Sequence, residues 1–277
     1  MKKYCLLLFV LYSQILCSKN VIDSVNYRFV YDVQAKKYEK SNRLFTDEHY
    51  LDIGYSGVSM YYSRWYERGF QIIEEVMRNG GSMHDVRRIK DEEGVEPSDF
   101  EYYILKNYPQ ASQQTVDCYS LEIFQYQEPM GQAWVLAEGD TIVLGHTCHK
   151  AVCRYHGKEW TAYYTTDIPI ADGPWKLCGL PGLIMRAYDG AHEFIFNCIG
   201  IQQNVGDKLF FREGKRHIMK PKEAQRLVEQ IDENPDSYYE AKEGAIGEMR
   251  IYDDKGKEMK NITLPKRVYY ESYSSEE

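Results

Sequence analysis

The stretch that decides the fold runs from Lys158 to Asp189 and reads KEWTAYYTTDIPIADGPWKLCGLPGLIMRAYD. Near its start, residues 160–166 are rich in Tyr, Thr and Trp, residue types that favour the pleated, half-buried surface of a strand. Residues 183–188, near its end, form another strand-like run. Between the two runs Pro169 interrupts the pattern, because a proline cannot donate a hydrogen bond to a neighbouring strand. The stretch therefore predicts two strands joined by a long, turn-rich connection.

Two turns divide this connection. The first is Asp172-Gly173-Pro174, in which aspartate can bond to its own backbone, glycine tolerates positive φ, and proline favours an extended residue before it. In the second turn, Pro181 followed by Gly182 suits the two central positions of a type II turn, where the later residue needs positive φ. The sequence thus predicts that the chain reverses sharply at both places.

The apolar residues around these turns allow two interpretations. A hydrophobic corner joining two strands would bury them, and Pro-Gly turns with apolar flanks commonly pack in this way. Alternatively, an exposed apolar loop would contact a ligand or a partner protein. In that second interpretation the binding residues are Trp175, Leu180, Pro181, Leu183 and Ile184.

The sequence GPWKLCGLPGLI, preceded by WTAYYTTDIPI, resembles the GLPGLI family, secreted proteins of Gram-negative bacteria named for that hexapeptide. The complete hexapeptide occupies residues 179–184, and the resemblance extends over roughly 134–200, including Cys148 and Trp160. This resemblance implies an exported protein of the periplasm or of the cell surface, associated with the outer membrane. Because the family has no established activity, the resemblance implies no reaction.

Residues 1–18 have the composition of a secretory signal peptide. Lys2 and Lys3 precede a short apolar run that ends at Leu16, and Cys17 follows. A basic start, a short apolar centre and small residues at the end are typical of such signals. The run is too short to anchor the chain in a bilayer, and no later stretch is long and apolar enough for a transmembrane helix. Acylation of Cys17 is an alternative, although Leu16 is bulky for lipoprotein processing.

The composition indicates one acidic domain after the signal peptide. The chain has 34 Lys and Arg against 42 Asp and Glu, a formal net charge of −8. This charge disfavours nucleic acids and anionic membrane surfaces as partners. Residues 19–277 are enough to bury a substantial core, and all-β units of this length commonly form a single domain.

Patterns along the rest of the chain predict a mainly β, α+β fold, a curved antiparallel sheet or open barrel with one or two helices. Residues 26–33 alternate like a half-buried strand, whereas 67–78 and 221–233 carry apolar residues at helical spacing. Glu138-Gly139-Asp140 is predicted to be a hairpin turn. The charged segment near 82–98 is predicted to be a mobile insertion, and the C-terminal tail to be frayed.

Five cysteines follow the signal peptide, and in an exported protein they favour disulfides over free thiols. They are Cys118, Cys148, Cys153, Cys178 and Cys198. Because five is an odd number, at least one is unpaired or pairs between chains. Cys148 and Cys153 lie an odd number of residues apart, so a regular strand would direct them to opposite faces. Cys178 is the expected partner for one of these two, and we favour a Cys153–Cys178 disulfide.

Residues 146–156 contain the densest cluster of side chains that can bind metals. His146 and Cys148 could share one strand face, as could His149 and Cys153. Zinc or copper would need several of these side chains on one side of a site. Their spacing matches no standard zinc pattern, and disulfides would consume the thiols. We therefore expect disulfides and surface histidines here and no cofactor, with a metal site as the alternative.

No sequence pattern points to a reaction. The chain has no G-x-S-x-G motif and no glycine-rich phosphate loop. Asp167 and Asp172 could form a carboxylate pair for acid–base chemistry, but aspartates beside turns commonly serve as turn ligands. The sequence therefore favours an exported, non-catalytic envelope binding protein that engages an apolar small molecule or a partner envelope protein. The alternatives are an envelope enzyme, metal-dependent through residues 146–156, and a structural scaffold.

Overall fold

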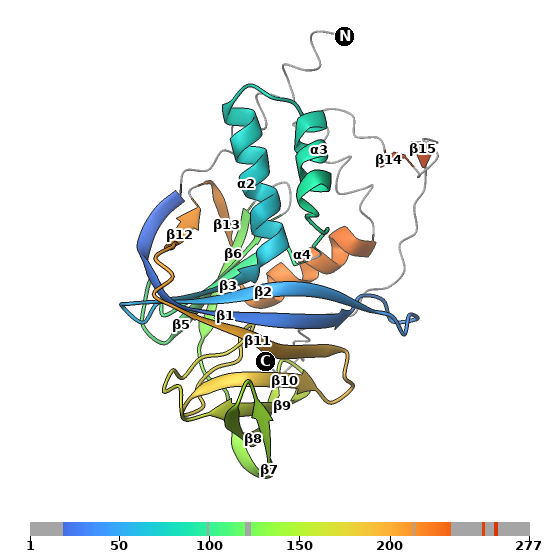
Figure 1. Ribbon diagram of the computed structural model, residues 1–277. Helices are drawn as coiled ribbons and strands as arrows, with labels where there is room; N and C mark the ends of the chain where they lie inside the picture. The colour runs from blue at the N-terminus through green and yellow to red at the C-terminus, as the bar shows by residue number, and fades with distance from the viewer. Residues whose placement is uncertain are drawn as a thin grey trace.

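The computed structural model describes residues 19–98, 100–119, 123–212, 214–233, 251–252 and 258–259. The predicted signal peptide and most of the predicted C-terminal tail lie outside the described residues. Figure 1 shows a strongly curved sheet, with the helices in the upper part of the view and one end of the sheet at the bottom.

Within the described residues, thirteen strands form one sheet. They are β1 (Lys19–Lys36), β2 (Leu44–Gly54), β3 (Ser59–Ser63), β4 (Tyr102–Lys106), β5 (Gln113–Tyr119), β6 (Ile123–Pro129), β7 (Val135–Val143), β8 (His146–Tyr155), β9 (Lys158–Thr165), β10 (Leu183–Asp189), β11 (Phe194–Gln203), β12 (Lys208–Arg212) and β13 (Arg216–Ile218). Two further strands, β14 (Ile251–Tyr252) and β15 (Glu258–Met259), pair with each other.

The strands lie in the order β13-β6-β5-β4-β3-β2-β1-β11-β10-β9-β8-β7, and β12 pairs with β1 outside this path. The β13–β6 pairing is parallel and the other pairings are antiparallel. The sheet curves without closing on itself (Figure 1). The predicted mainly β fold with a curved antiparallel sheet is confirmed.

The long strand β1 is the centre of this sheet. It pairs with β2 along one edge, and with β11 and β12 along the other. Phe29, Tyr31 and Val33 alternate along it and are fully buried, as the pattern of residues 26–33 predicts. Residues from both halves of the sheet belong to one large core cluster, and a second cluster contains residues of β1, β3, β4, β6 and β12.

The described residues form three helices: α2 (Arg64–Arg78), α3 (Met83–Glu93) and α4 (Pro221–Glu233). α2 and α4 contact the sheet, whereas α3 packs against α2. α2 and α4 fall where apolar residues recur at helical spacing. None of the described helices is long and apolar enough to cross a membrane.

The segment near 82–98 is predicted to be a mobile loop, but most of it forms the helix α3. Ser82 caps the helix and forms a reciprocal capping box with Asp85, and Gly94 ends the helix in the left-handed conformation. Val86 is buried in a small cluster with Ile72 and other residues of α2. A single apolar stripe against α2 therefore suffices to order a segment of highly charged composition.

The Lys158–Asp189 stretch forms two antiparallel strands, β9 and β10, and the intervening residues 166–182 pack onto the sheet as a turn-rich connection. The type II turn predicted at Pro181-Gly182 is wrong, because Gly182 does not have positive φ. A Cβ atom at Gly182 would lie only 2.0 Å from the carbonyl oxygen of Thr165. The glycine is therefore required for close approach of two backbones rather than for a left-handed turn.

A row of three alanines crosses the sheet beneath this connection. Ala151 of β8 lies opposite Ala162 of β9, which lies opposite Ala187 of β10, and all three are fully buried. Trp175 and Leu180 of the connection belong to the same core cluster. The small alanine side chains leave room on this face for the large ones, as close packing of the core requires.

The turn predicted at residues 138–140 is wrong. The chain continues through this point as part of β7, and the β7–β8 pairing shifts register between Ala137 and Thr141. The reversal comes later, at Leu144 and Gly145, which both have positive φ. The three residues Glu138-Gly139-Asp140 therefore make a bulge in an edge strand instead of a hairpin loop.

Candidate functional site

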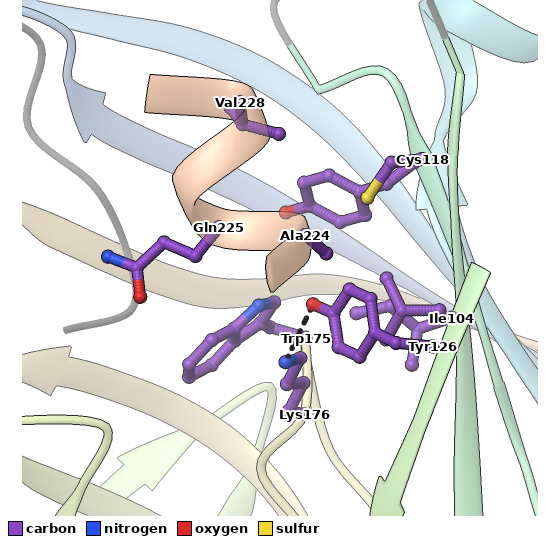
Figure 2. A pocket seen from close by; sticks show the side chains of 10 residues that line it. Ile104, Cys118, Tyr126, Trp175, Lys176, Ala224, Gln225 and Val228 are labelled. Atoms are coloured by element: carbon purple, nitrogen blue, oxygen red, sulfur yellow. Dashed lines mark hydrogen bonds between the residues drawn. The ribbon is translucent and has the colours of Figure 1, made fainter. Parts of the chain in front are cut away.

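A cavity of about 140 Å³ lies between α4 and the sheet (Figure 2). Its lining comes from strands β4, β5 and β6, from the β9–β10 connection and from one face of α4. The lining residues are Tyr102, Ile104, Val116, Cys118, Tyr126, Trp175, Lys176, Ala224, Gln225 and Val228.

The strand register sets the floor of this cavity. Residues two apart on a strand face the same way, so Tyr102 and Ile104 of β4 both point toward α4. They lie opposite Cys118 and Val116 of β5, respectively, and Val116 lies opposite Tyr126 of β6. Three neighbouring strands thus present one continuous patch of aromatic and branched side chains.

The connection and α4 form the rest of the lining. Trp175 has positive φ and is almost fully buried, and Figure 2 shows its ring beneath α4. Ala224 and Val228 lie one helical turn apart on α4, so both face the cavity. The exposed surface of the lining is almost entirely apolar. An engineered apolar cavity of about 150 Å³ in another protein binds benzene.

A charged pair lies at the polar end of this cavity. The side chain of Lys176 is fully buried, forms an ion pair with Glu128, and donates to the hydroxyl of Tyr126 at 3.0 Å. The Nζ atom of Lys176 also lies 4.7 Å from the centre of the Tyr126 ring. The ammonium is therefore held between a carboxylate and an aromatic face instead of being solvated.

Other buried polar groups surround Glu128. Gln114 donates to it at 3.0 Å, and His156 Nε2 lies 3.3 Å from its second carboxylate oxygen. Burial alone would raise the pKa of Glu128, but Lys176 and His156 outweigh burial and lower this pKa to about 2. The carboxylate is thus ionised at neutral pH and keeps the buried lysine neutralised.

Residues 149–186 match the family model described as "Protein of unknown function (Porph_ging)". This is the GLPGLI-type family. The match confirms the resemblance predicted from the sequence, and it covers most of β8, all of β9, the connection with Trp175 and Lys176, and the start of β10.

Two solved structures of PNGF-II, in the P21 and C2 space groups, are similar to this chain with TM-scores of 0.44 and 0.46. Each is 11% identical and covers 74% of this chain. The matched region covers 33% and 32% of those chains, so this chain spans about a third of their length. No curated protein matches the sequence significantly.

The GLPGLI hexapeptide itself is a structural corner. Leu180, Leu183 and Ile184 are fully packed in the core, and Pro181 is exposed beside them. This is the hydrophobic-corner interpretation, and the exposed apolar loop is not formed. Of the five candidate binding residues only Trp175 lines the cavity.

The two aspartates that could have formed a carboxylate pair lie in different places. Asp172 is buried and pairs with Lys106, whereas Asp167 lies at the surface and pairs with His146 at 2.9 Å. The paired-carboxylate arrangement considered from the sequence is therefore not formed. Asp172 instead holds the connection against the sheet.

The predicted metal ligands are also separated. His146 pairs with Asp167, His149 pairs with Asp140 at 3.0 Å, and Cys148 and Cys153 lie in the core. Among the described residues, no three His, Cys, Asp or Glu side chains are placed to hold a metal ion together. The structure thus gives the 146–156 metal hypothesis no geometric support.

In the described part of the chain none of the five cysteines forms a disulfide, including Cys153 and Cys178, for which a disulfide is predicted. The expectation that Cys148 and Cys153 face opposite sides is wrong, since both are buried in the same core cluster. The alternation is broken where β8 faces the register shift of β7. Burial raises the pKa of the Cys153 thiol to about 12, which keeps it protonated.

Sequence reasoning missed most of the residues that form the cavity. Tyr102, Val116, Tyr126 and Ala224 come from separate parts of the chain and carry no local motif. The signal that could have found Lys176 is its position between Trp175 and Leu177, because a lysine inside an apolar run needs a buried partner.

Proposed function

We propose that this protein is an exported, non-catalytic binding protein whose cavity under α4 holds a small apolar molecule or the apolar end of a larger one. The single observation that carries the proposal is the apolar cavity of about 140 Å³ between α4 and the sheet. Export rests on the predicted signal peptide and on the resemblance to secreted proteins.

The charges at the end of the cavity support binding rather than chemistry. The nitrogen of Lys176 pairs with Glu128 and donates to the hydroxyl of Tyr126, so it is already engaged by groups of the protein. The carboxylate of Glu128 is ionised and already accepts bonds from Lys176 and Gln114. These groups stabilise the wall of the cavity and leave its volume to an apolar occupant.

The proposal is tested with benzene and toluene as probes, using thermal unfolding and titration calorimetry on the chain without residues 1–18. Saturable binding and a raised Tm are expected, because a ligand that binds only the folded state stabilises it. Ala224→Phe should fill the cavity and abolish binding, and Arg226→Phe is the matched control, since Arg226 is exposed on the same helix. If Ala224→Phe does not fold, Val228→Phe serves instead.

Failure of both probes to bind the folded protein, or equal binding by Ala224→Phe and Arg226→Phe, would overturn the proposal. The first result would favour a structural scaffold. The second would move the binding site away from α4 and toward another surface.

A further inference from the structure

The strand β7 ends the sheet on the side opposite β13. Within the described part of the chain it pairs with β8 along one edge only, and Figure 1 shows it at the bottom of the view, away from the helices. It is nine residues long, and all nine are exposed or half-buried. Most edge strands are short or covered, because unpaired backbone groups readily pair with another chain.

Large apolar side chains gather along this edge. Nine large hydrophobic residues are exposed in the described part of the chain, and four of them lie between residues 135 and 144. They are Val135, Leu136, Ile142 and Leu144, and the exposed fraction of Ile142 reaches 73%. Exposed apolar residues scattered singly need no explanation, but a group of them on an unpaired edge indicates a contact surface.

The charges at the centre of β7 restrict what can occupy this edge. Glu138 and Asp140 lie in the bulge between the two apolar ends and are exposed. If the β7 strands of two copies paired around their centres, four carboxylates would come together, and like charges across strands are destabilising. A strand that matches this edge would instead carry basic residues at its centre, opposite the carboxylates, and apolar residues toward its ends.

We propose that β7 is a docking edge for an extended polypeptide segment of another protein, with apolar residues toward both ends and Lys or Arg at its centre. The segment adds as an antiparallel strand, continuing the antiparallel order of β10, β9, β8 and β7. Backbone hydrogen bonds provide affinity in this mode of recognition, and side-chain contacts provide selectivity. The apolar residues of the segment contact Val135, Leu136, Ile142 and Leu144. Its basic centre pairs with Glu138, which therefore favours basic over acidic segments.

This docking edge is independent of the cavity proposed above. The cavity is lined from β4, β5, β6, α4 and the β9–β10 connection, and it contains no residue of β7. Either proposal can therefore fail while the other stands.

The test uses fluorescein-labelled nine-residue peptides, the length of β7, that alternate Val and Thr and carry either two Lys or two Glu at the centre. Binding to the chain without residues 1–18 is followed by fluorescence anisotropy. The Lys peptide should bind at least about tenfold more tightly than the Glu peptide, and the preference should weaken as salt is raised. N-methylation of alternate peptide nitrogens should abolish binding, because it removes the added strand's backbone donors.

Variants of the protein assign the effect to this edge. The double variant Glu138→Lys, Asp140→Lys should reverse the preference between the two peptides, and circular dichroism checks that it folds. Both substituted side chains are exposed. The matched control is Glu159→Lys on β9, an exposed carboxylate within the sheet; this variant should leave the preference unchanged.

Three results would overturn the proposal: no binding of the Lys peptide at its solubility limit, equal binding of the Lys and Glu peptides, or binding that survives N-methylation. Analytical ultracentrifugation tests whether a second copy of this chain occupies the edge instead. A dimer of the unliganded protein that Ile142→Asp dissociates would assign the edge to a second copy of this chain instead.

Discussion

The ammonium of Lys106 lies 2.5 Å from Oδ1 of Asp172, and the side chain of the lysine is fully buried. Lys106 ends β4, whereas Asp172 opens the first turn of the β9–β10 connection. The second oxygen of Asp172 accepts from Ser59 of β3 at 2.5 Å, and Lys106 also donates to the carbonyl of Gly173 at 2.8 Å. The connection that carries the GLPGLI hexapeptide is thus fixed to strands far from it in the sequence.

Removing this lysine should strongly destabilise the fold. Lys106→Met leaves the buried carboxylate of Asp172 without its counter-charge, and breaking a buried pair in this way costs about 3–5 kcal/mol. Lys36→Met is the matched control, because the Lys36–Glu193 pair is partly exposed and contributes about 1 kcal/mol or less. Urea denaturation measures both free energies of unfolding, and equal losses in the two variants would contradict the structural role of the pair.

The same relationship shows where sequence reasoning stops. The strands around the connection were predictable, since Tyr, Thr and Trp near one end and Leu and Ile near the other are local signals. The partners of Asp172 were not, because Ser59 and Lys106 lie 113 and 66 residues away along the chain. Their neighbourhood is set by strand order, which local patterns do not encode.

The candidate site divides in the same way. Trp175 and the helix at 221–233 were predictable from residue type and periodicity, and both contribute to the cavity. That they meet over Val116 and Tyr126 follows from the register of β4, β5 and β6. Hydrophobic patterning therefore predicted the apolar stretches correctly but could not distinguish a packed corner from a cavity wall.

Stability should depend on pH through Glu128. Its pKa falls from 4.5 to about 2 on folding, so the folded state favours the ionised form. Above pH 4.5 this depressed pKa stabilises the folded state by about 3 kcal/mol. The contribution is lost as the pH falls from 4.5 toward 2. Glu128→Gln should be less stable at pH 7 and should flatten this part of the pH profile, measured by urea denaturation.

A suitable control for that profile is Glu159→Gln, whose carboxylate is exposed on β9. It should retain the acid-dependent loss between pH 4.5 and 2. If Glu128→Gln shows the same loss as the unmodified chain, another buried acid is responsible and the Glu128–Lys176 pair does not control the profile.

Gly182 should tolerate no side chain. Gly182→Ala places a Cβ atom 2.0 Å from the carbonyl oxygen of Thr165, a backbone atom that can move only if β9 and β10 separate. We expect a loss of roughly 3 kcal/mol or more, near the upper end of single-substitution effects. Gly190→Ala is the matched control, because its Cβ would meet Glu159 at an ordinary 3.7 Å.

Thermal and urea unfolding compare these two glycine variants. Gly190→Ala should change stability by less than about 1 kcal/mol, since no close contact opposes it. A Gly182→Ala variant as stable as Gly190→Ala would show that the hexapeptide corner can relax, and the close-approach explanation of this glycine would be wrong.

The thiols should react unequally in the folded protein without residues 1–18. Cys118 is only partly buried and lines the cavity, whereas the other four cysteines are buried. Burial raises the pKa of Cys198, like that of Cys153, to about 12, so neither forms the reactive thiolate at neutral pH. One thiol per chain should therefore react rapidly with Ellman's reagent, and Cys118→Ser should remove that fast phase. Toluene should slow the fast phase if it occupies the same cavity.

Unfolding in the absence of reductant then decides the disulfide question. All five thiols of the chain without residues 1–18 should titrate in denaturant if none of these cysteines is in a disulfide, as in the structure. A total of three, with Cys153 and Cys178 recovered in one cross-linked peptide by mass spectrometry, would instead establish the disulfide predicted from the sequence. Because Cys178 lies beside the hexapeptide, that result would also mean that a covalent bond holds the connection against β8, in addition to the Lys106–Asp172 pair.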